Sequence, residues 1–307
     1  MKPQAVTVSV NYADFLVHTL EENHKLFDKW VIVTDTKDTP TKELCDKYSD
    51  KGVICIQTDI FYSNGASFNK FKGINEGLKY IDRDKWVLFL DSDIVIHDMF
   101  NHILKNISLD ESCIYGLDRL NCKGLVAWNQ YKKDGGIVVD NWLLHDSGLK
   151  FGSRLVHYYG HEDGDGQFAG WNPIGFFQLA HPSAFSRYPD NTKGADHCDI
   201  MFARLWPRDK RIFIPETLVI HLESADTKKA DNWYGRKSSP FLLETEMTTT
   251  TTTTLKTPII EIIDMLNKVH DSGAAYRPGP KKKKGISHHI RKVVHYIKGK
   301  IRDYFCK

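Results

Sequence analysis

Residues 86–96 read Trp-Val-Leu-Phe-Leu-Asp-Ser-Asp-Ile-Val-Ile, an apolar run interrupted by two aspartates, Asp91 and Asp93. The run predicts a central strand covered on both faces, because such strands are continuously hydrophobic. Buried carboxylates without partners are unfavourable, so we expect both acids at the end of that strand. Two carboxylates there are suited to hold a divalent cation, which in turn binds phosphate groups. The alternative is that they form a turn or cap the next helix.

Two kinds of apolar pattern alternate before this stretch. Runs rich in β-branched residues predict strands, and apolar residues at helical spacing predict helices. The strands are expected at residues 5–10, 30–34 and 53–57, and the helices at 14–27, 41–48 and 69–80. This alternation is typical of an α/β domain with a mostly parallel sheet flanked by helices. Ligands bind such sheets outside the carboxyl ends of the strands, where Asn11, Asp35 and Asp91 are expected.

The sequence changes in character after about residue 105. Elements become shorter and glycine and aromatic residues more frequent, which predicts loops and short strands laid over one edge of the sheet. A last strand, carrying His221, is expected at 212–222. Residues 225–256 are polar, with a threonine tract at 248–254 that is typical of a linker.

Residues 257–307 return to helical periodicity and end in a basic amphipathic tail, residues 281–307. We therefore expect a folded domain over 1–224, the linker over 225–256, and this C-terminal helical segment. The tail could be a helix docked on the domain or a nucleic-acid arm, but the latter would need interleaved aromatic residues. One apolar face beside a lysine-rich face favours a membrane-surface helix.

The composition of the 307-residue chain, 41% hydrophobic with a net charge of +3, suits one large domain with an appendage. Six dispersed cysteines without a CxxC pair are typical of a reducing compartment. The N-terminus lacks a signal-peptide core, and no run reaches the roughly 18 apolar residues of a membrane span. We expect a cytoplasmic protein, or one peripheral to the cytosolic face of a membrane. The absence of a P-loop, GxGxxG or Gly-x-Ser-x-Gly disfavours ATP hydrolysis, NAD chemistry and serine hydrolysis.

Four further segments join the Asp-x-Asp motif in resembling one family. They are Val-Ser-Val-Asn-Tyr at 8–12, Val-Ile-Val-Thr-Asp at 31–35, Phe-Asn-Lys-Phe-Lys-Gly-Ile-Asn at 68–75 and Ile-Pro-Glu-Thr-Leu-Val-Ile-His-Leu at 214–222. Over about residues 5–224 the chain resembles the GT-A glycosyltransferases, nucleotide-sugar transferases built on a Rossmann-like sheet. The 68–75 segment departs from the family pattern, with Phe71 where Gly is usual and Gly73 where Ala is usual.

The resemblance implies roles for individual residues of this chain. Asp91, Asp93 and His221 are expected to hold Mn²⁺ or Mg²⁺, since carboxylate and imidazole both suit such ions. The residues expected to bind the nucleotide-sugar donor are Asn11, Tyr12, Asp35, Lys70, Asn75 and Ser92. The implied reaction is metal-dependent sugar transfer to an acceptor hydroxyl of a glycan, glycolipid or protein.

Such a transferase needs a base for the acceptor hydroxyl. The segment 194–202 resembles the family's acidic motif, in which an acid precedes an aromatic residue by three positions, and this points to Asp199. Asp196 is the second candidate, and either acid could instead cap the following helix. A base implies inversion at the anomeric carbon, whereas a retaining relative would need none. Residues 173–179 form either a loop beneath the acceptor or a packed core strand, and 161–165 an acceptor-side loop or a second cation site.

Two rival functions come from other classes. A nucleotidyltransferase acting on sugar phosphates also uses paired acids on such a sheet. It would carry a Gly-rich basic loop after the first strand, where this chain has Asn11-Tyr12-Ala13-Asp14. A catalytically silent sugar- or nucleotide-binding protein would have no reason to keep Asp91, Asp93, His221 and Asp199.

Overall fold

The computed structural model describes residues 1–133, 138–139, 172–190, 194–195, 198–224, 232, 234–241 and 256–257. The helical segment expected at 257–307 lies outside the described residues except for Thr257, as do the loop 161–165 and most of the linker 225–256. Within the described ranges, no helix is long and apolar enough to cross a membrane.

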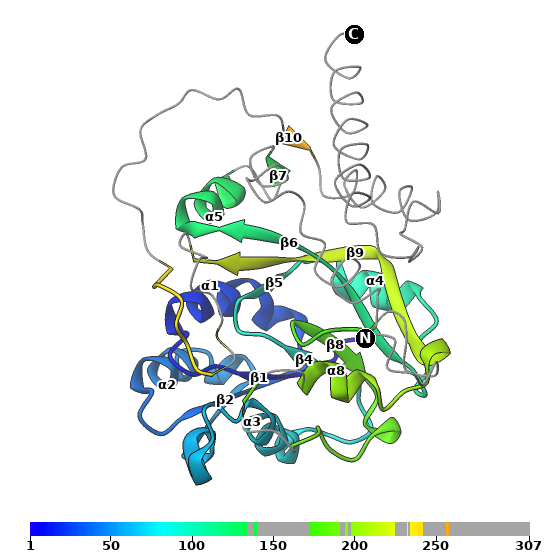
Figure 1. Cartoon of the computed structure of the whole chain (residues 1–307). Helices are drawn as coiled ribbons and strands as arrows, with labels where there is room; N and C mark the ends of the chain where they lie inside the picture. Colours follow the sequence, from blue (N-terminus) through cyan, green and yellow to red (C-terminus); the bar gives the residue numbers. More distant parts are fainter. Residues whose placement is uncertain are drawn as a thin grey trace, which may run out of the picture.

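An eight-stranded sheet, in the order β3-β2-β1-β4-β8-β6-β9-β5, forms the centre of the molecule (Figure 1). Its strands are β1 (Gln4–Val8), β2 (Lys29–Asp35), β3 (Val53–Thr58), β4 (Val87–Leu90), β5 (Ile94–Ile96), β6 (Ile114–Lys123), β8 (Phe177–Ala180) and β9 (Arg211–Glu223). The half β3-β2-β1-β4 is parallel throughout, and β6 is parallel to β9. Strands β8 and β5 run antiparallel to their neighbours. The predicted α/β fold with a mostly parallel sheet is thereby confirmed.

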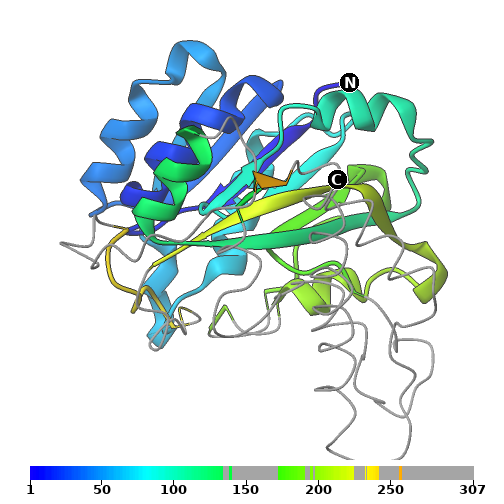
Figure 2. The ribbon, with the colours of Figure 1, turned by 90° about the horizontal axis from the view of Figure 1, so that it is seen from above.

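Helices cover both faces of the sheet. They are α1 (Ala13–Asn23), α2 (Thr39–Asp46), α3 (Lys70–Gly77), α4 (Phe100–Asn106), α5 (Gly124–Lys133) and α8 (Cys198–Ala203). Buried residues of α1, α2 and α4 share one apolar core, and those of α3 and α8 share the core of the opposite face, as Figures 1 and 2 show. A separate antiparallel pair joins β7 (Val138–Val139) to β10 (Lys256–Thr257).

Helix α3 lies unusually close to the sheet. A Cβ on Gly77 would come 2.7 Å from Cγ1 of Val6 on β1, and one on Gly73 would come 2.5 Å from the Phe61 ring. The helix begins behind Asn69, whose side chain accepts a hydrogen bond from the Lys72 backbone N–H. The glycines therefore let the helix approach β1, and this places Lys70 at the carboxyl edge of the sheet.

The stretch 86–96 is not one strand. Strand β4 ends at Leu90, the chain turns through Asp91 to Asp93, and β5 then pairs antiparallel with β9 at the far edge of the sheet. The prediction of two acids at a strand end is confirmed, but the second apolar run belongs to a different part of the sheet. Apolarity indicates burial, and it does not specify which neighbours cover a short strand.

The prediction for the segment after residue 105 is wrong in one respect. Strands β6 and β8 are interior strands of the main sheet and not short strands over its edge. Strand β8 pairs antiparallel with β4, and all four of its residues are buried. Its sequence, Phe-Gln-Leu-Ala, has no apolar alternation, so the pattern alone cannot place it.

Buried side chains of α1 hold the turn and β5 in place. The Thr19 hydroxyl donates a hydrogen bond of 2.8 Å to the carbonyl of Ser92. The Asn23 amide donates to the carbonyl of Ile94 at 2.7 Å and accepts from the backbone N–H of Ile96 at 2.9 Å. Thr19 and Asn23 are fully buried, so these bonds satisfy backbone groups that water cannot reach.

Replacement of Asn23 by alanine tests this attachment. Asn23→Ala leaves a buried carbonyl and a buried N–H unsatisfied, so the free energy of unfolding should fall by roughly 2–4 kcal/mol. Chemical denaturation measures the loss. The control is Asn106→Ala, because Asn106 is exposed and bonds only within its own helix, to His102. Equal stability of the two variants would contradict the attachment.

Candidate active site

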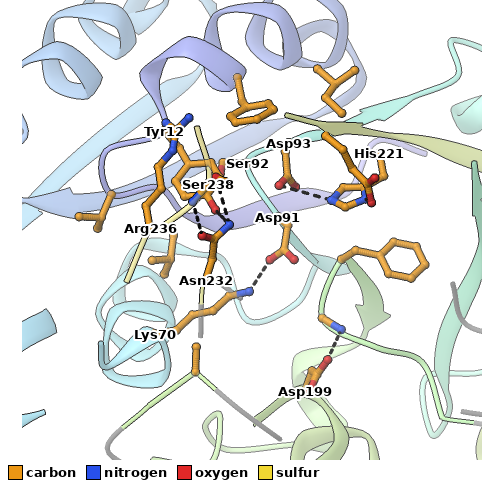
Figure 3. Close-up of a pocket in the computed structure, with 18 of the residues that line it drawn as sticks. Tyr12, Lys70, Asp91, Ser92, Asp93, Asp199, His221, Asn232, Arg236 and Ser238 are labelled. Atoms are coloured by element: carbon orange, nitrogen blue, oxygen red, sulfur yellow. Dashed lines mark hydrogen bonds and ion pairs between the residues drawn. The ribbon is translucent and has the colours of Figure 1, made fainter. Parts of the chain in front are cut away.

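A cavity of about 540 Å³ opens at the carboxyl edge of the parallel strands (Figure 3). It brings together side chains that are far apart in the sequence. The predicted site residues that line it are Tyr12, Lys70, Asp91, Ser92, Asp93, Asp199 and His221. Asp196, the second candidate base, lies outside the described residues. The structure therefore gathers most of the predicted residues at one place.

Three predicted donor-binding residues do not line the cavity. The backbone N–H of Asn11, a residue with φ of 60°, donates a 2.6 Å hydrogen bond to the carboxylate of Asp38. Asp35 accepts a hydrogen bond from the backbone N–H of Lys37. The side-chain amide of Asn75 instead forms two hydrogen bonds with the backbone of Tyr188. It donates to the Tyr188 carbonyl and accepts from the Tyr188 N–H. Asn75 therefore anchors residue 188 to α3.

The first acid of the motif is paired with a lysine. The ammonium of Lys70 donates a hydrogen bond to Oδ1 of Asp91 and forms an ion pair with it (Figure 3). Burial alone would lower the pKa of Lys70, but the charge of Asp91 outweighs it and raises that pKa above its ordinary value. Lys70 is therefore a cation at the base of the cavity.

The second acid lies beside a histidine. Oδ2 of Asp93 is 3.4 Å from Nε2 of His221, and Nδ1 of His221 is 3.3 Å from Oε1 of Glu223. Strand pairing sets this contact, because Ile94 is opposite His221 and the N–H of Leu222 donates to the carbonyl of Asp93 at 2.8 Å. Burial and Arg119 lower the pKa of His221, but Asp93 and Glu223 outweigh them and raise it to about 9.

The donor atoms suit a hard cation, although the arrangement is not a complete cage. Oδ1 of Asp93 is buried and has no hydrogen-bond partner, which leaves a carboxylate oxygen available to a ligand. No group of three or more His, Cys, Asp or Glu side chains in the described part of the chain is placed to hold an ion. Asp91 instead bonds Lys70. The residue types and the free oxygen of Asp93 fit a divalent metal. Such an ion would replace the Lys70 ammonium as the partner of the Asp91 carboxylate.

Asp199 lies in the first turn of α8, across the cavity from the two other acids (Figure 3). Its Oδ2 accepts a 2.7 Å hydrogen bond from the backbone N–H of Gly175, and its Oδ1 accepts from that of Ile200. The carboxylate is thus oriented by main-chain donors and still faces the cavity. In the segment 173–179, the predicted core strand is present as the start of β8, and Gly175 and Phe176 line the cavity before it.

Sequence reasoning missed several cavity residues. These are Arg119 and Glu223 on β6 and β9, and Asn232, Arg236 and Ser238 from the predicted linker. For Arg119 a signal existed, because polar residues at 119, 121 and 123 alternate with the buried Leu120 and Cys122. This is the period of a strand with one polar face. The polar composition around residue 236 carries no comparable signal.

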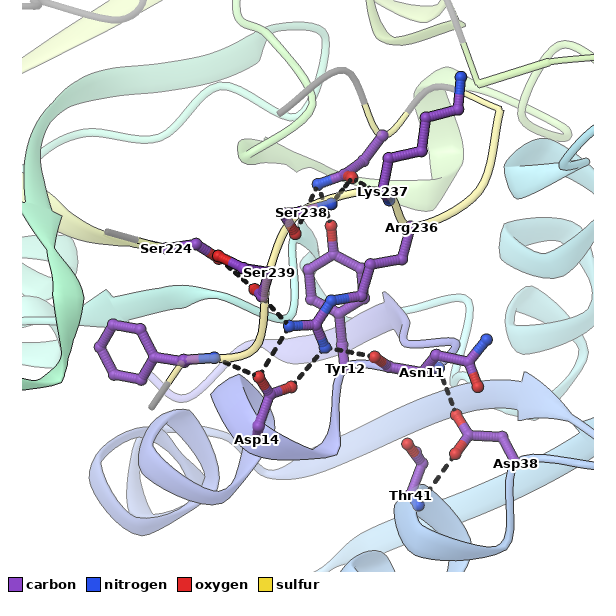
Figure 4. Close-up of polar contacts among 12 residues, drawn as sticks. Asn11, Tyr12, Asp14, Asp38, Thr41, Ser224, Arg236, Lys237, Ser238 and Ser239 are labelled. Atoms are coloured by element: carbon purple, nitrogen blue, oxygen red, sulfur yellow. Dashed lines mark hydrogen bonds and ion pairs between the residues drawn. The ribbon is translucent and has the colours of Figure 1, made fainter. Parts of the chain in front are cut away.

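The described residues 232 and 234–241, here called the strap, pack on the start of α1 (Figure 4). The guanidinium of Arg236 bonds both carboxylate oxygens of Asp14 and the carbonyl of Asn11. It also lies 4.6 Å from the centroid of the Tyr12 ring. The backbone N–H of Phe241 donates to Asp14 at 2.7 Å. This part of the predicted linker therefore belongs to the wall of the cavity.

The α/β fold is that of a GT-A glycosyltransferase, and the comparison of sequences agrees. Residues 5–160 match the family model described as glycosyl transferase family 2, which is half of the chain. The chain belongs to glycosyltransferase family 2, and it is a glycosyltransferase that uses a nucleotide-sugar donor. No curated protein matches it.

Solved structures show only weak similarity. Glucosyl-3-phosphoglycerate synthase of M. tuberculosis has 11% identity and a TM-score of 0.37, covering 85% of this chain and 92% of its own. The inositol-1-phosphate CTP transferase of T. maritima has 10% identity and a TM-score of 0.34, covering 88% and 97%. Because these scores lie below 0.5, no conclusion about this chain rests on them.

The Arg236–Asp14 pair gives a test of the strap. Burial raises the pKa of Asp14, but Arg236 and the Phe241 N–H outweigh it and hold the pKa below its ordinary value. The pair should therefore stabilise the fold above about pH 4 and lose this contribution as the pH falls through the lowered pKa.

Arg236→Gln should reduce the free energy of unfolding by roughly 1–3 kcal/mol at neutral pH. The difference from the wild type should shrink in acid, as measured by denaturation at a series of pH values. Lys237→Gln is the control, because Lys237 is exposed in the same strap. A difference that is independent of pH would contradict the role of Asp14.

Proposed function

We propose that this protein is a divalent-metal-dependent glycosyltransferase that inverts the anomeric carbon as it transfers a sugar to an acceptor hydroxyl. One observation carries the proposal. Asp91, Asp93, His221 and Asp199 come from three separate parts of the chain and line one cavity. A cation site at one wall and a carboxylate at the other are the two groups that such a transfer needs.

Asp91, Asp93 and His221 would hold Mn²⁺ or Mg²⁺. When bound, the metal supplies charge neutralisation for the departing nucleoside diphosphate. The unpartnered Oδ1 of Asp93 supports this assignment. Lys70, released from Asp91, would then be free to bind an oxygen of the same diphosphate, since its ammonium already lies in the cavity.

The donor would occupy the part of the cavity next to β1. Val8, Val10 and Phe68 provide apolar surface there, and Tyr12 and Ser92 provide polar groups. Asp35 and Asn11 remain candidates for the ribose or base from positions beside the cavity. Asn75 would act indirectly, through its hold on Tyr188.

Asp199 would accept the proton of the acceptor hydroxyl as its oxygen attacks the anomeric carbon. Two main-chain N–H groups fix the carboxylate, so its position does not depend on a mobile side chain. Attack from the side opposite to the leaving diphosphate gives inversion. The acceptor is a glycan, glycolipid or protein in this proposal, and contact of residues 281–307 with the cytosolic face of a membrane stays a prediction.

The nucleotidyltransferase alternative finds no support in the first loop. Helix α1 begins at Ala13, directly after Asn11 and Tyr12, so no room exists for a Gly-rich basic loop. The silent-binder alternative does not account for the oriented carboxylate of Asp199.

Removal of the second acid tests the metal site. Asp93→Asn keeps the size of the side chain but removes its charge, so release of nucleoside diphosphate should fall about 100-fold or more. The assay incubates the protein with a panel of nucleotide sugars and Mn²⁺, with and without a chelator. Asp98→Asn is the control, because Asp98 is exposed nearby. Undiminished, chelator-resistant release in Asp93→Asn would rule out the metal assignment.

Removal of the proposed base tests the stereochemical course. Asp199→Asn should slow sugar transfer roughly 100- to 10,000-fold, because an amide cannot take the proton. Binding of nucleoside diphosphate, measured by calorimetry, should stay near the wild-type value. Asp209→Asn serves as the matched exposed control. Full transfer activity in Asp199→Asn, with retention at the anomeric carbon, would refute the inverting mechanism.

A further inference from the structure

Arg119 is a cavity residue that the proposed mechanism does not use. It lies on β6 opposite Val219 of β9, two residues before His221 on that strand. Its Nε is buried and has no hydrogen-bond partner, and no ion pair to its guanidinium occurs among the described residues. Its contact is with the ring of Phe176, whose centroid is 4.8 Å away.

The other cations that line the cavity each have a carboxylate partner. Lys70 is paired with Asp91, Arg236 with Asp14, and His221 with Asp93. Arg119 is the exception within the described residues. A buried N–H group without a partner is unfavourable, and burial lowers the pKa of Arg119 although Glu223 and Asp93 oppose this.

The position of Arg119 indicates which ligand would complete it. Phe176 follows Gly175, whose N–H orients the proposed base Asp199. Arg119 therefore lies on the side of the cavity that carries Asp199, where the acceptor is proposed to bind. Lys70 lies on the side of the Asp-x-Asp turn. The Phe176 ring lies against the guanidinium, and this contact uses none of its N–H groups as hydrogen-bond donors to oxygen.

We propose that Arg119 binds a phosphate or carboxylate group of the acceptor, so that the acceptor is an acidic molecule. The planar guanidinium matches both anions through two parallel N–H···O bonds, and the anion would provide the partner that Arg119 lacks. The proposal rests on the proposed function only in identifying the ligand as the acceptor. The anion site itself is supported by the Nε of Arg119, which is buried and has no hydrogen-bond partner.

The test measures anion binding apart from catalysis. A panel of nucleoside diphosphates is first screened for binding in the presence of Mn²⁺. The one that binds best is then added at a saturating concentration, so that it fills the donor site. Inorganic phosphate, glycerol 3-phosphate and neutral glycerol are then titrated, and binding is followed by calorimetry and by the rise in melting temperature. The proteins are the wild type, Arg119→Gln, Arg119→Lys and the control Arg187→Gln, since the Arg187 side chain is 67% exposed.

We expect phosphate and glycerol 3-phosphate to bind the nucleotide-filled wild type and glycerol not to bind. Arg119→Gln should weaken anion binding at least about tenfold. The anion affinity of Arg119→Lys should lie between those of the wild type and Arg119→Gln, because lysine keeps the charge but loses the paired N–H donors of the guanidinium. Arg187→Gln should match the wild type. Without ligand, Arg119→Gln should melt no lower than the wild type, since it removes a buried Nε–H that has no hydrogen-bond partner.

Three outcomes would overturn the proposal. The first is anion binding that is equal in the wild type and Arg119→Gln. The second is loss of nucleoside diphosphate binding in Arg119→Gln, which would assign Arg119 to the donor diphosphate. The third is a lower melting temperature of ligand-free Arg119→Gln, which would make Arg119 a structural counter-charge. If no nucleoside diphosphate binds but phosphate binds through Arg119, the proposed function fails and the anion site stands.

Discussion

The turn from Asp91 to Asp93 is the constraint on which the rest of the structure depends. The chain must leave the buried strand β4, expose two carboxylates and return at once to a buried strand at the far edge of the sheet. Thr19 and Asn23 make this path possible. The Thr19 side chain satisfies the carbonyl of Ser92, and the Asn23 side chain satisfies the carbonyl of Ile94 and the N–H of Ile96 in β5. Helix α1 thus joins the edge where the donor is proposed to bind to the strand that aligns Asp93 with His221.

Charge pairing is the second organising feature of the cavity. The acids Asp91 and Asp93 each have a basic partner, Lys70 and His221, from a different element. Each pair gives a partly desolvated charge an opposite charge beside it. In the proposed function, a bound cation would replace Lys70 beside Asp91, and the donor diphosphate would bind the released Lys70. The strap adds a third pair, Arg236 with Asp14, at the entrance to α1. Arg119 differs from these cations because its guanidinium lies over the ring of Phe176 and its Nε lacks an acceptor among the described residues.

Local patterns were sufficient for the longer strands of the sheet. The strands predicted at 30–34 and 53–57 are β2 and β3, and the last strand, predicted at 212–222, is β9. Long apolar runs and helical spacing specify such elements because each buries a face over many residues. The short strand β5 was misplaced, and β8 was predicted only as one of two alternatives, since three or four residues do not specify a partner strand. Arg236 was missed because its role comes from packing on Asp14, which is more than 200 residues away in sequence.

The sequence by itself determined the α/β class and the Asp-x-Asp turn at a strand end, and it supplied the acids and the histidine that are proposed as metal ligands and base. Those features are local, because they follow from the apolar period of each segment and from the cost of burying a carboxylate. Only the tertiary structure decided that Lys70 holds Asp91, that His221 lies 3.4 Å from Asp93, and that Arg119 is left without a carboxylate among the described residues. Such contacts join strands and helices through sheet order and register, and these depend on packing of the whole domain.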